Sequence, residues 1–442
     1  MRRVAFTVAI LGIGALGACT IDRTIGINQP DDGGAAVLDM ATWRPSVDLA
    51  RAPAPDLSPN SHSGKVDFLF MVDDSNSMAA MQDVLARSFV NLHKFLLAKV
   101  TAEGRTVDVN LGVVTSDYGA GTTGAPGCQP SPGGKAGRLQ AIGAGAKQGC
   151  LPPVGANFIH AVFAPNPNGW DPKDGENNLP PGQDFEATFA CMSAVGAQGC
   201  GFEHQLESVH AALHNNIPEN KGFLRDDALL VVVFVTNEDD ASASPATDVF
   251  DRNKAQQYGY EDSYSRQTRF AIVCGPDPGA FPPYADSNGP LSNCRPAPNP
   301  NASENYAGDG PGKQYDVSRY IDFFTKPRWQ GGVKDDPLRV ILASIAAPAD
   351  PVTVILGNPA TPAGQSYLQC GQLNENSTPP CVPLLQHSCT NPQRPVLFGD
   401  PAVRLSAVVN AVQLHTGSSI CDGDYGDTMV SIAKIVDAYL GL

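Results

Sequence analysis

Residues 65–78, KVDFLFMVDDSNSM, form the stretch that decides the expected fold. Their first half is an almost unbroken apolar run, which is typical of a strand buried on both faces of a parallel α/β sheet. The run ends at Asp73, and a helical pattern starts after Ser77. Asp73, Ser75 and Ser77 thus place a carboxylate and two hydroxyls just past a strand, where they can converge on a hard cation, Mg²⁺ or, with a looser shell, Ca²⁺. In the alternative interpretation, Ser75 or Ser77 caps the next helix, and Asp73 and Asp74 are solvated turn residues.

The most strand-like run of the chain, residues 228–236 (ALLVVVFVT), also ends in oxygen-bearing side chains. Asn237, Asp239 and Asp240 follow it, with Glu238 between them. Ligands of doubly wound sheets bind where the strand order reverses, so two such strand ends would face one crevice if the strands are neighbours there. We therefore take Asn237, Asp239 and Asp240 as further candidate metal ligands.

Strand patterns alternate with helical patterns along the chain, which predicts βαβ units. The expected fold class is α/β, with a doubly wound, mostly parallel sheet of the Rossmann-like type. Two Gly/Pro-rich segments, at about 117–181 and 241–335, are expected to be long, disulfide-containing insertions. Further strands are expected at 107–115, 158–163 (an edge hairpin), 270–273, 338–346, 352–356 and 418–421, and helices at 78–96, 185–195, 202–213, 405–412 and 429–439. The strand at 352–356 is expected to extend the one before it or to pair with it.

Residues 65–78 resemble the first strand and the metal-ion-dependent adhesion site (MIDAS) of a von Willebrand factor type A (vWA) domain. The pattern of that family is an apolar strand, then D-x-S-x-S and often a Met, and here Asp73, Ser75 and Ser77 are the matching residues. The resemblance implies a vWA fold and a bound Mg²⁺ or Ca²⁺ with one open coordination position. A carboxylate from a partner protein would complete the shell of that ion.

Two other loops of the family's site differ in this sequence. The second loop normally supplies a Thr, and the corresponding stretch 199–203 (GCGFE) has none. The third loop normally supplies an Asp, often as T-D, whereas here Asn237 follows Thr236 and acidic residues come next. The pieces VDDSNSM, GCGFE, TNEDDAS and SSICDGDYGD, in this order over residues 65–440, also resemble a group of large cysteine-containing vWA lipoproteins of Gram-negative bacteria.

The first residues predict export. Arg2 and Arg3 precede an apolar run over residues 4–16, which is too short to span a membrane and is typical of a secretory signal. Residues 16–19, LGAC, resemble a bacterial lipobox, which implies that Cys19 is lipidated and becomes the mature N-terminus. A plain signal peptide cleaved nearby is the alternative.

The predicted organisation has three parts. Residues 1–19 are expected to be a lipoprotein signal peptide, and residues 20–63, rich in Pro, Asp and Ser, a flexible tether. Residues 64–442 are expected to form one vWA-like domain. The residue after Cys19 is Thr20, whereas an Asp at this position would resemble an inner-membrane retention signal. The outer membrane or the cell surface is therefore the expected location.

Eleven cysteines fit an exported protein, because disulfides form in oxidising compartments. Apart from Cys19, the disulfide candidates are Cys128, Cys150, Cys191, Cys200, Cys274, Cys294, Cys370, Cys381, Cys389 and Cys421. We expect neighbours in the sequence to pair, namely Cys128 with Cys150, Cys191 with Cys200 and Cys274 with Cys294. Sequence alone leaves the connectivity open.

Charge and motifs narrow the classes of function. A net charge of −15 and the lack of a dense Lys/Arg cluster argue against nucleic acid as a partner. Neither a nucleophile elbow, G-x-S-x-G, nor a phosphate-binding G-x-x-x-x-G-K-[ST] loop is present, so an enzyme is not expected. His210 and His214, four residues apart on a predicted helix, could bind Zn²⁺, but a solvated helix face also explains this pattern.

We therefore expect a lipid-anchored surface protein that binds an acidic residue of a partner protein through Mg²⁺ or Ca²⁺. Membrane attachment would come through the lipid at Cys19. One alternative is a structural envelope lipoprotein whose site no longer binds metal. The other is a surface hydrolase with an unrecognised site.

Overall fold

The computed structural model describes residues 64–104, 106–164, 172–214, 216–251, 268–275, 289–299, 312–358 and 381–441. The predicted signal peptide and tether lie outside these residues, and so do Cys19 and Cys370. All described residues belong to one compact unit, Ala54–Leu442. Within them, no helix has both the length and the apolar character needed to cross a membrane.

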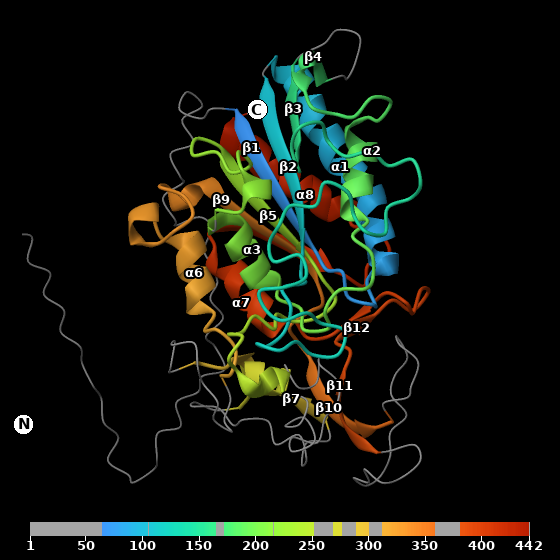
Figure 1. Ribbon diagram of the computed structural model, residues 1–442, viewed down its shortest axis with the longest axis vertical. Coiled ribbons are helices and arrows are strands. Elements are labelled where there is room, and N and C mark those ends of the chain that lie inside the picture. The colour runs from blue at the N-terminus through green and yellow to red at the C-terminus, as the bar shows by residue number, and fades with distance from the viewer. Residues whose placement is uncertain are drawn as a thin grey trace, which may run out of the picture. The chain divides into compact units, whose positions relative to one another are not determined.

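A seven-stranded mixed sheet lies at the centre, in the order β14-β9-β5-β1-β2-β3-β4 (Figure 1). Its strands are β1 (Lys65–Val72), β2 (Val107–Thr115), β3 (Ile159–Phe163), β4 (Pro172–Asn177), β5 (Leu229–Val235), β9 (Val340–Ala346) and β14 (Leu414–Ser419). β2, β1, β5, β9 and β14 run parallel, and β3 is antiparallel to both β2 and β4. The predicted α/β class is therefore confirmed, and the expected edge hairpin at 158–163 is β3 with β4.

The chain builds the sheet outward from β1 in both directions. β2, β3 and β4 are added on one side and β5, β9 and β14 on the other, so the strand order reverses between β1 and β5. These two strands pair in parallel from Val66 opposite Leu229 to Val72 opposite Val235. Beyond the last pair, Asp73 N donates a hydrogen bond to Val235 O at 2.9 Å. The residues that follow the two strands therefore lie side by side at the carboxyl edge of the sheet.

Helices cover both faces of the sheet, which explains why β1 is apolar along nearly its whole length. Successive side chains of a strand point to opposite faces, and Phe68 and Phe70 pack against α1, α2 and α8. Leu69 and Met71 pack on the other face, against α3, α6 and α7 (Figure 1). The helices are α1 (Ala79–Glu103), α2 (Phe185–Ser193), α3 (Gln205–His214), α6 (Ser318–Thr325), α7 (Val403–Ala411) and α8 (Gly426–Leu440).

Smaller sheets and single helical turns complete the described structure. One sheet has the order β11-β10-β7, and two pairs are β12-β13 and β6-β8. Their strands are β6 (Ile272–Val273), β7 (Gly289–Leu291), β8 (Arg295–Pro296), β10 (Val352–Gly357), β11 (Val382–Gln386), β12 (Cys389–Thr390) and β13 (Phe398–Gly399). The 3₁₀ turns are η1 (Pro218–Asn220), η2 (Asp248–Phe250), η3 (Arg328–Gln330) and η4 (Pro337–Arg339).

Two strand predictions need correction. β10, expected to extend the strand at 338–346 or to pair with it, instead pairs with β11 and β7. Pro348 and Pro351 stand between the two strands, and because proline has no N–H to donate, the ladder of β9 cannot continue through them. The strand expected at 418–421 is β14, which begins at Leu414. This edge strand has a single partner and needs no apolar run, so its pattern is weak.

Four disulfides join described cysteines, and they overturn two of the three expected pairs. Cys128 bonds to Cys200 and Cys150 to Cys191, instead of the pairs 128–150 and 191–200. The expected bond between Cys274 and Cys294 is confirmed, and Cys389 bonds to Cys421. Cys381 is disulfide-bonded as well. The segment after β2 packs against the end of α2, where Gly143 N donates a hydrogen bond to Cys191 O and Gly145 N donates one to Ala194 O, both at 2.9 Å. Cysteines that are neighbours in space are therefore not neighbours in sequence.

The β11-β10-β7 sheet packs near the carboxyl edge of the central sheet. A buried cluster joins Ala120, which follows β2, and Ala241, which follows β5, to Val354 of β10 and Leu385 of β11. The loops after the central strands are therefore supported by a second core.

Candidate functional site

Polar side chains gather where β1 and β5 end. Ser75 Oγ and Ser77 Oγ are 3.3 Å apart, and Ser77 Oγ donates a hydrogen bond to Asn237 Oδ1 at 2.9 Å. Ser75 and Asn237 are buried, whereas Ser77 is partly exposed. The hydroxyl of Ser77 thus lies close to one oxygen of each of two other predicted ligands. We call Ser75, Ser77 and Asn237 the Ser77 group, and solvent reaches it at Ser77.

The carboxylate of Asp73 lies next to the Ser77 group and is fully buried. Its Oδ1 accepts hydrogen bonds from Ser75 N at 2.7 Å and Ser116 Oγ at 3.0 Å, and its Oδ2 accepts one from Thr236 Oγ1 at 2.7 Å. Burial raises the pKa of Asp73 above its usual value, although these hydrogen bonds act in the opposite direction. The donors fix the orientation of a carboxylate that is otherwise costly to bury.

More carboxyl groups surround this point. Burial, and then the charge of Asp73, raise the pKa of Asp74 to about 7. The pKa of Glu238 is raised well above its usual value, first by burial and then by the charges of Glu203, Asp400 and Asp73. A hydrogen bond also joins the side chains of Glu238 and Glu203. A bound cation would lower the pKa values of these crowded carboxyl groups and so favour their ionised forms.

The donor set fits a hard divalent ion. In an octahedral Mg²⁺ shell with bonds of about 2.1 Å, adjacent ligand oxygens lie about 3 Å apart. The separations of 3.3 Å between the hydroxyls of Ser75 and Ser77, and of 2.9 Å between Ser77 and Asn237, match this spacing. The side-chain amide of Asn237 accepts the hydrogen bond of Ser77 through Oδ1, and its Nδ2 is buried with no partner. The neutral oxygens would supply geometry, and Asp73 most of the charge.

Asp239 and Asp240, the two other predicted ligands, make their hydrogen bonds elsewhere. The carboxylate of Asp239 accepts hydrogen bonds from Arg404 N and Leu405 N at 2.9–3.0 Å, at the start of α7. Asp240 accepts one from Leu206 N in α3 at 3.0 Å and one from Arg404 Nη2 at 3.1 Å. Both carboxylates thus hold helices α3 and α7 in place, and the structure does not join them to the Ser77 group.

The stretch 199–203, which resembles the family's second loop, packs beside the site. Gly199 N donates a hydrogen bond to Asp74 O at 2.7 Å, and Glu203 forms an isolated bridge with Asp117. Ser116, which directly follows β2, donates a hydrogen bond from its hydroxyl to Asp73 Oδ1 at 3.0 Å.

The zinc alternative finds little support. Among the described residues, no group of three or more His, Cys, Asp or Glu side chains could hold a metal ion. The rings of His210 and His214 are 5.1 Å apart, and burial lowers the pKa of His210 to about 3. Glu207, on the same helix, instead binds Arg319 Nη2 at 3.0 Å and Tyr320 Oη at 2.8 Å. The Ser77 group is not a cluster of this type, because its oxygens come from the hydroxyls of two serines and the amide of an asparagine.

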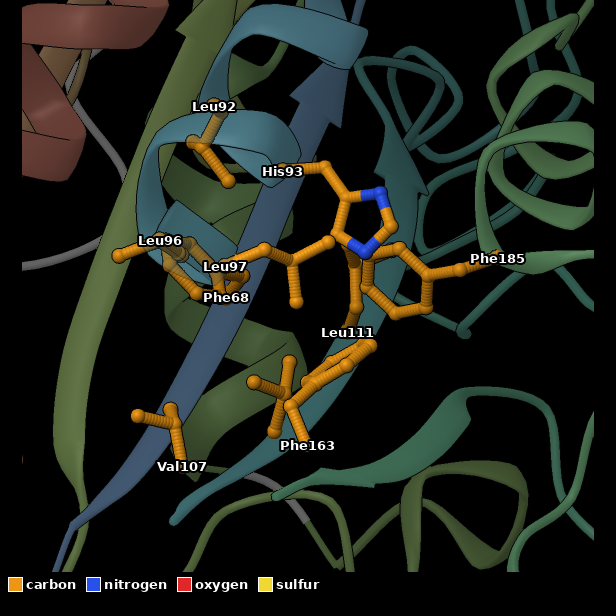
Figure 2. A pocket seen from close by; sticks show the side chains of 10 residues that line it. Phe68, Leu92, His93, Leu96, Leu97, Val107, Leu111, Phe163 and Phe185 are labelled. Carbon is orange, nitrogen blue, oxygen red and sulfur yellow. The ribbon is translucent and has the colours of Figure 1, made fainter. Parts of the chain in front are cut away.

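A small apolar cavity of about 10 Å³ lies where α1 and α2 pack against the sheet. Figure 2 shows the side chains that line it. Phe163 and Phe185 line it, and the ring of His93 lies 4.8 Å from that of Phe185. His93 Nδ1 is 2.7 Å from Glu186 Oε1, which ties α1 to α2. A space of this size holds about one water molecule, so it is not a ligand site.

Sequence reasoning missed several residues of the site. Ser116 and Thr236 each donate a hydrogen bond to Asp73. Their positions could have been noticed in the sequence, because Ser116 directly follows β2 and Thr236 directly follows β5. Asp400 was also missed. Its N donates to Asn237 O at 2.7 Å, and its Oδ1 lies 2.7 Å from His387 Nδ1. No sequence signal marked Asp400, because it comes from a distant loop.

Known proteins give no further guidance on this arrangement. The sequence matches no protein-family model and no curated protein. The function is therefore argued from the residues at the carboxyl edge of the sheet.

Proposed function

We propose that this protein binds Mg²⁺ or Ca²⁺ at the Ser77 group and uses the ion to hold an acidic side chain of a partner protein. One observation carries the proposal. Ser77 Oγ lies 3.3 Å from Ser75 Oγ and 2.9 Å from Asn237 Oδ1, which suits adjacent oxygens of a divalent-ion shell, and this group stands where the strand order of the sheet reverses.

Each residue would have a separate task in this proposal. Ser75, Ser77 and Asn237 would hold the ion through neutral oxygens, and Asp73, already bound by three hydrogen-bond donors, would act through a bridging water. A bound divalent ion supplies a positive charge to which a carboxylate can coordinate. Asn76 and Ser77 are exposed or partly exposed, so a partner would approach from their side.

The proposal extends to the location of the protein. The resemblance of residues 16–19 to a lipobox supports a lipid anchor at Cys19, with residues 20–63 as a tether to the outer membrane or cell surface. If flexible, a tether of this length has a root-mean-square span of about 35–40 Å. That span would hold the binding site clear of a membrane surface and available to a protein partner.

Calorimetric titration of Mg²⁺ and of Ca²⁺ into the mature protein tests the metal site. We expect saturable binding by the parent protein and its loss in the double variant Ser75→Ala/Ser77→Ala. Ser431→Ala is the control, because its hydroxyl bonds to Asp427 O within α8. If the folded parent protein binds neither ion, the proposal fails and the structural envelope lipoprotein becomes the better account.

A further inference from the structure

One exposed aromatic side chain lies in the turn that joins α6 to β9. Among the described residues, Trp329 is the most exposed of the large hydrophobic side chains, at 81%. It belongs to η3, and we call residues 326–334 the Trp329 turn. Tryptophan is among the residue types that most often anchor contacts with other molecules. The indole is therefore a candidate contact point on the surface of the protein.

The backbone of the Trp329 turn is fixed by hydrogen bonds and close packing. Val333 N donates a hydrogen bond to Phe323 O in α6 at 2.8 Å. Gly332 N donates one to Pro327 O at 3.1 Å, which closes the turn around η3. A Cβ atom at Gly332 would lie 1.6 Å from Lys326 O, so only glycine allows the turn to close this tightly. The turn is thus formed before any contact is made, which lowers the entropy lost on binding.

The Trp329 turn lies where the chain enters the central sheet. Lys65, the first residue of β1, pairs with Asp227 at 2.7 Å. Arg328, next to Trp329, pairs with the adjacent Asp226 at 2.8 Å. The turn and the start of β1 are therefore held by two neighbouring aspartates, at the amino edge of the sheet.

This amino edge is opposite to the edge that carries the Ser77 group. β1 runs from Lys65 to Val72, and the Ser77 group lies beyond its last residue. A strand of eight residues spans about 26 Å. A molecule in contact with the Trp329 turn would therefore leave the Ser77 group free for its own partner.

The described basic side chains at this edge already have partners. Besides the pairs of Arg328 and Lys65, Lys326 pairs with Asp322 at 2.7 Å. Arg339 Nη1 donates a hydrogen bond to Asp227 O at 2.9 Å. Because acids stand beside these cations, their attraction to an anionic surface would be weak and screened by salt. A contact made here should depend on the indole rather than on charge.

We propose that the Trp329 turn rests on a membrane surface of zwitterionic lipids, with the indole of Trp329 in the headgroup region. This inference rests on the membrane attachment proposed above, through residues 20–63 and the lipid at Cys19. Residues 20–63 join the domain at the start of β1, the edge at which Trp329 stands. Tryptophan is enriched at membrane–water interfaces, because its ring is apolar and its N–H is polar.

The tether explains how one side chain can suffice. A single indole holds a bilayer only weakly, but a tether keeps it near the surface at a high effective concentration. The contact would orient the domain, so that the amino edge faces the membrane and the Ser77 group faces away from it.

Fluorescence of a mature chain with Trp329 as its only tryptophan tests the proposal. Trp43→Phe and Trp170→Phe remove the other two. The thiol of Cys19 is coupled to a maleimide lipid in phosphatidylcholine vesicles, which replaces the natural anchor. On coupling, we expect the emission of Trp329 to shift to shorter wavelength, and brominated acyl chains to quench it, because the indole leaves water for the headgroup region. Both effects should persist at high salt.

A matched control moves the indole to the opposite edge. Trp329→Phe/Val396→Trp, in the same chain, places it at a position that is 55% exposed, between β12 and β13. The residue after β13, Asp400, binds Asn237 O at the carboxyl edge. Emission from the indole at position 396 should therefore stay unshifted and unquenched.

Three results would overturn the proposal. Unshifted and unquenched emission of Trp329 on vesicles would assign the turn to a protein partner instead. Equal quenching at positions 329 and 396 would show that the domain has no preferred orientation, and loss of the effects at high salt would show a contact made by charge. Because the thiol coupling replaces the lipid, the result does not depend on lipidation of Cys19. Ser75→Ala/Ser77→Ala should leave the quenching of Trp329 unchanged, so a failure of the metal site is read separately.

Discussion

Gly199 packs directly against Asp74, next to the residues of the proposed metal site. A Cβ atom at this position would lie 2.2 Å from Asp74 Oδ1. Gly199→Ala must therefore displace Asp74 or the loop, and we expect a loss of about 1–3 kcal/mol in the free energy of unfolding, together with weaker Mg²⁺ binding. Urea denaturation and calorimetry measure the two effects. Gly423→Ala is the control, since its Cβ would have no neighbour nearer than 3.8 Å, and equal losses in both variants would contradict the packing argument.

His204 gives the protein an acid-sensitive residue close to this loop. It is fully buried between the rings of Tyr118 and Phe250, at 5.9 and 5.7 Å. Burial lowers the pKa of His204 from 6.5 to about 4, against a smaller opposing effect of Asp240. The unfolded chain therefore binds a proton at higher pH than the folded chain does. Stability present above pH 6.5 is lost as the pH falls towards 4, by an amount on the order of 3 kcal/mol.

Replacing this histidine by an aromatic residue that does not titrate tests that expectation. His204→Phe should make the fall in the free energy of unfolding between about pH 7 and about pH 4 smaller by about 2–3 kcal/mol. Urea denaturation at a series of pH values gives both curves. His415→Phe, at an exposed position in β14, should follow the parent protein. Parallel curves for the parent and His204→Phe would show that another group controls the acid response.

The positions of the residues in the proposed metal site could be predicted from the sequence to different degrees. The structure places Ser77 and Asn237 together, as expected, because each follows a buried apolar strand and the two strands are neighbours. The partners of Asp73 could not be chosen in advance, since Ser and Thr occur throughout the chain and only packing selects Ser116. Asp239 has the same local sequence context as Asn237, yet its side chain points to a helix start that lies far along the chain.

At the scale of secondary-structure elements, α7 depends on a carboxylate from another part of the chain. Its first amides, at Arg404 and Leu405, bind the side chain of Asp239. Asp239→Ala removes this cap and should lower the free energy of unfolding by about 2 kcal/mol, while Mg²⁺ affinity changes less than about twofold. Asp335→Ala, at an exposed position, is the control for stability. If Asp239→Ala folds but loses Mg²⁺ binding, Asp239 belongs to the ligand set after all.

Elements with continuous apolar runs were predicted best. β1 and β5 are buried on both faces, so nearly every residue in them is apolar. The first and last residues of both strands could therefore be predicted from the sequence to within about a residue. β14 lies at the edge with the burial of its side chains mixed, and its pattern gave the wrong start. β10 was recognised as a strand but assigned to the wrong sheet, because strand patterns carry no information on the partner that a strand selects.

At the scale of the whole molecule, two disulfides hold different parts of the structure in place. Cys128–Cys200 spans 72 residues and holds the loop beside Asp74, whereas Cys150–Cys191 spans 41 residues and holds the end of α2. Loop-closure entropy gives each bond up to about 4 kcal/mol of stability. Two of the predicted pairs were wrong because sequence spacing does not show that the segment after β2 packs against the end of α2.

Removing each bond separates its effect on stability from its effect on binding. We expect Cys128→Ser/Cys200→Ser and Cys150→Ser/Cys191→Ser to lose about 2–4 kcal/mol each. Only the first should also weaken Mg²⁺ binding, because its loop contacts Asp74 through Gly199. Urea denaturation and calorimetry on both variants provide the comparison, and equal effects on Mg²⁺ affinity would contradict it. Peptide mapping without reduction checks the four bonds directly.

The reversal of strand order between β1 and β5 also governs when the Ser77 group can form during folding. Ser77 and Asn237 are 160 residues apart in the chain. During synthesis, a chain that has emerged only as far as β4 already contains Ser75 and Ser77 but lacks the strand that completes the group. Closing so long a loop is entropically unfavourable until the intervening segments have folded, so the contact forms late. A metal ion would then stabilise only chains that have already assembled the central sheet, and so would act as a check on completed folding.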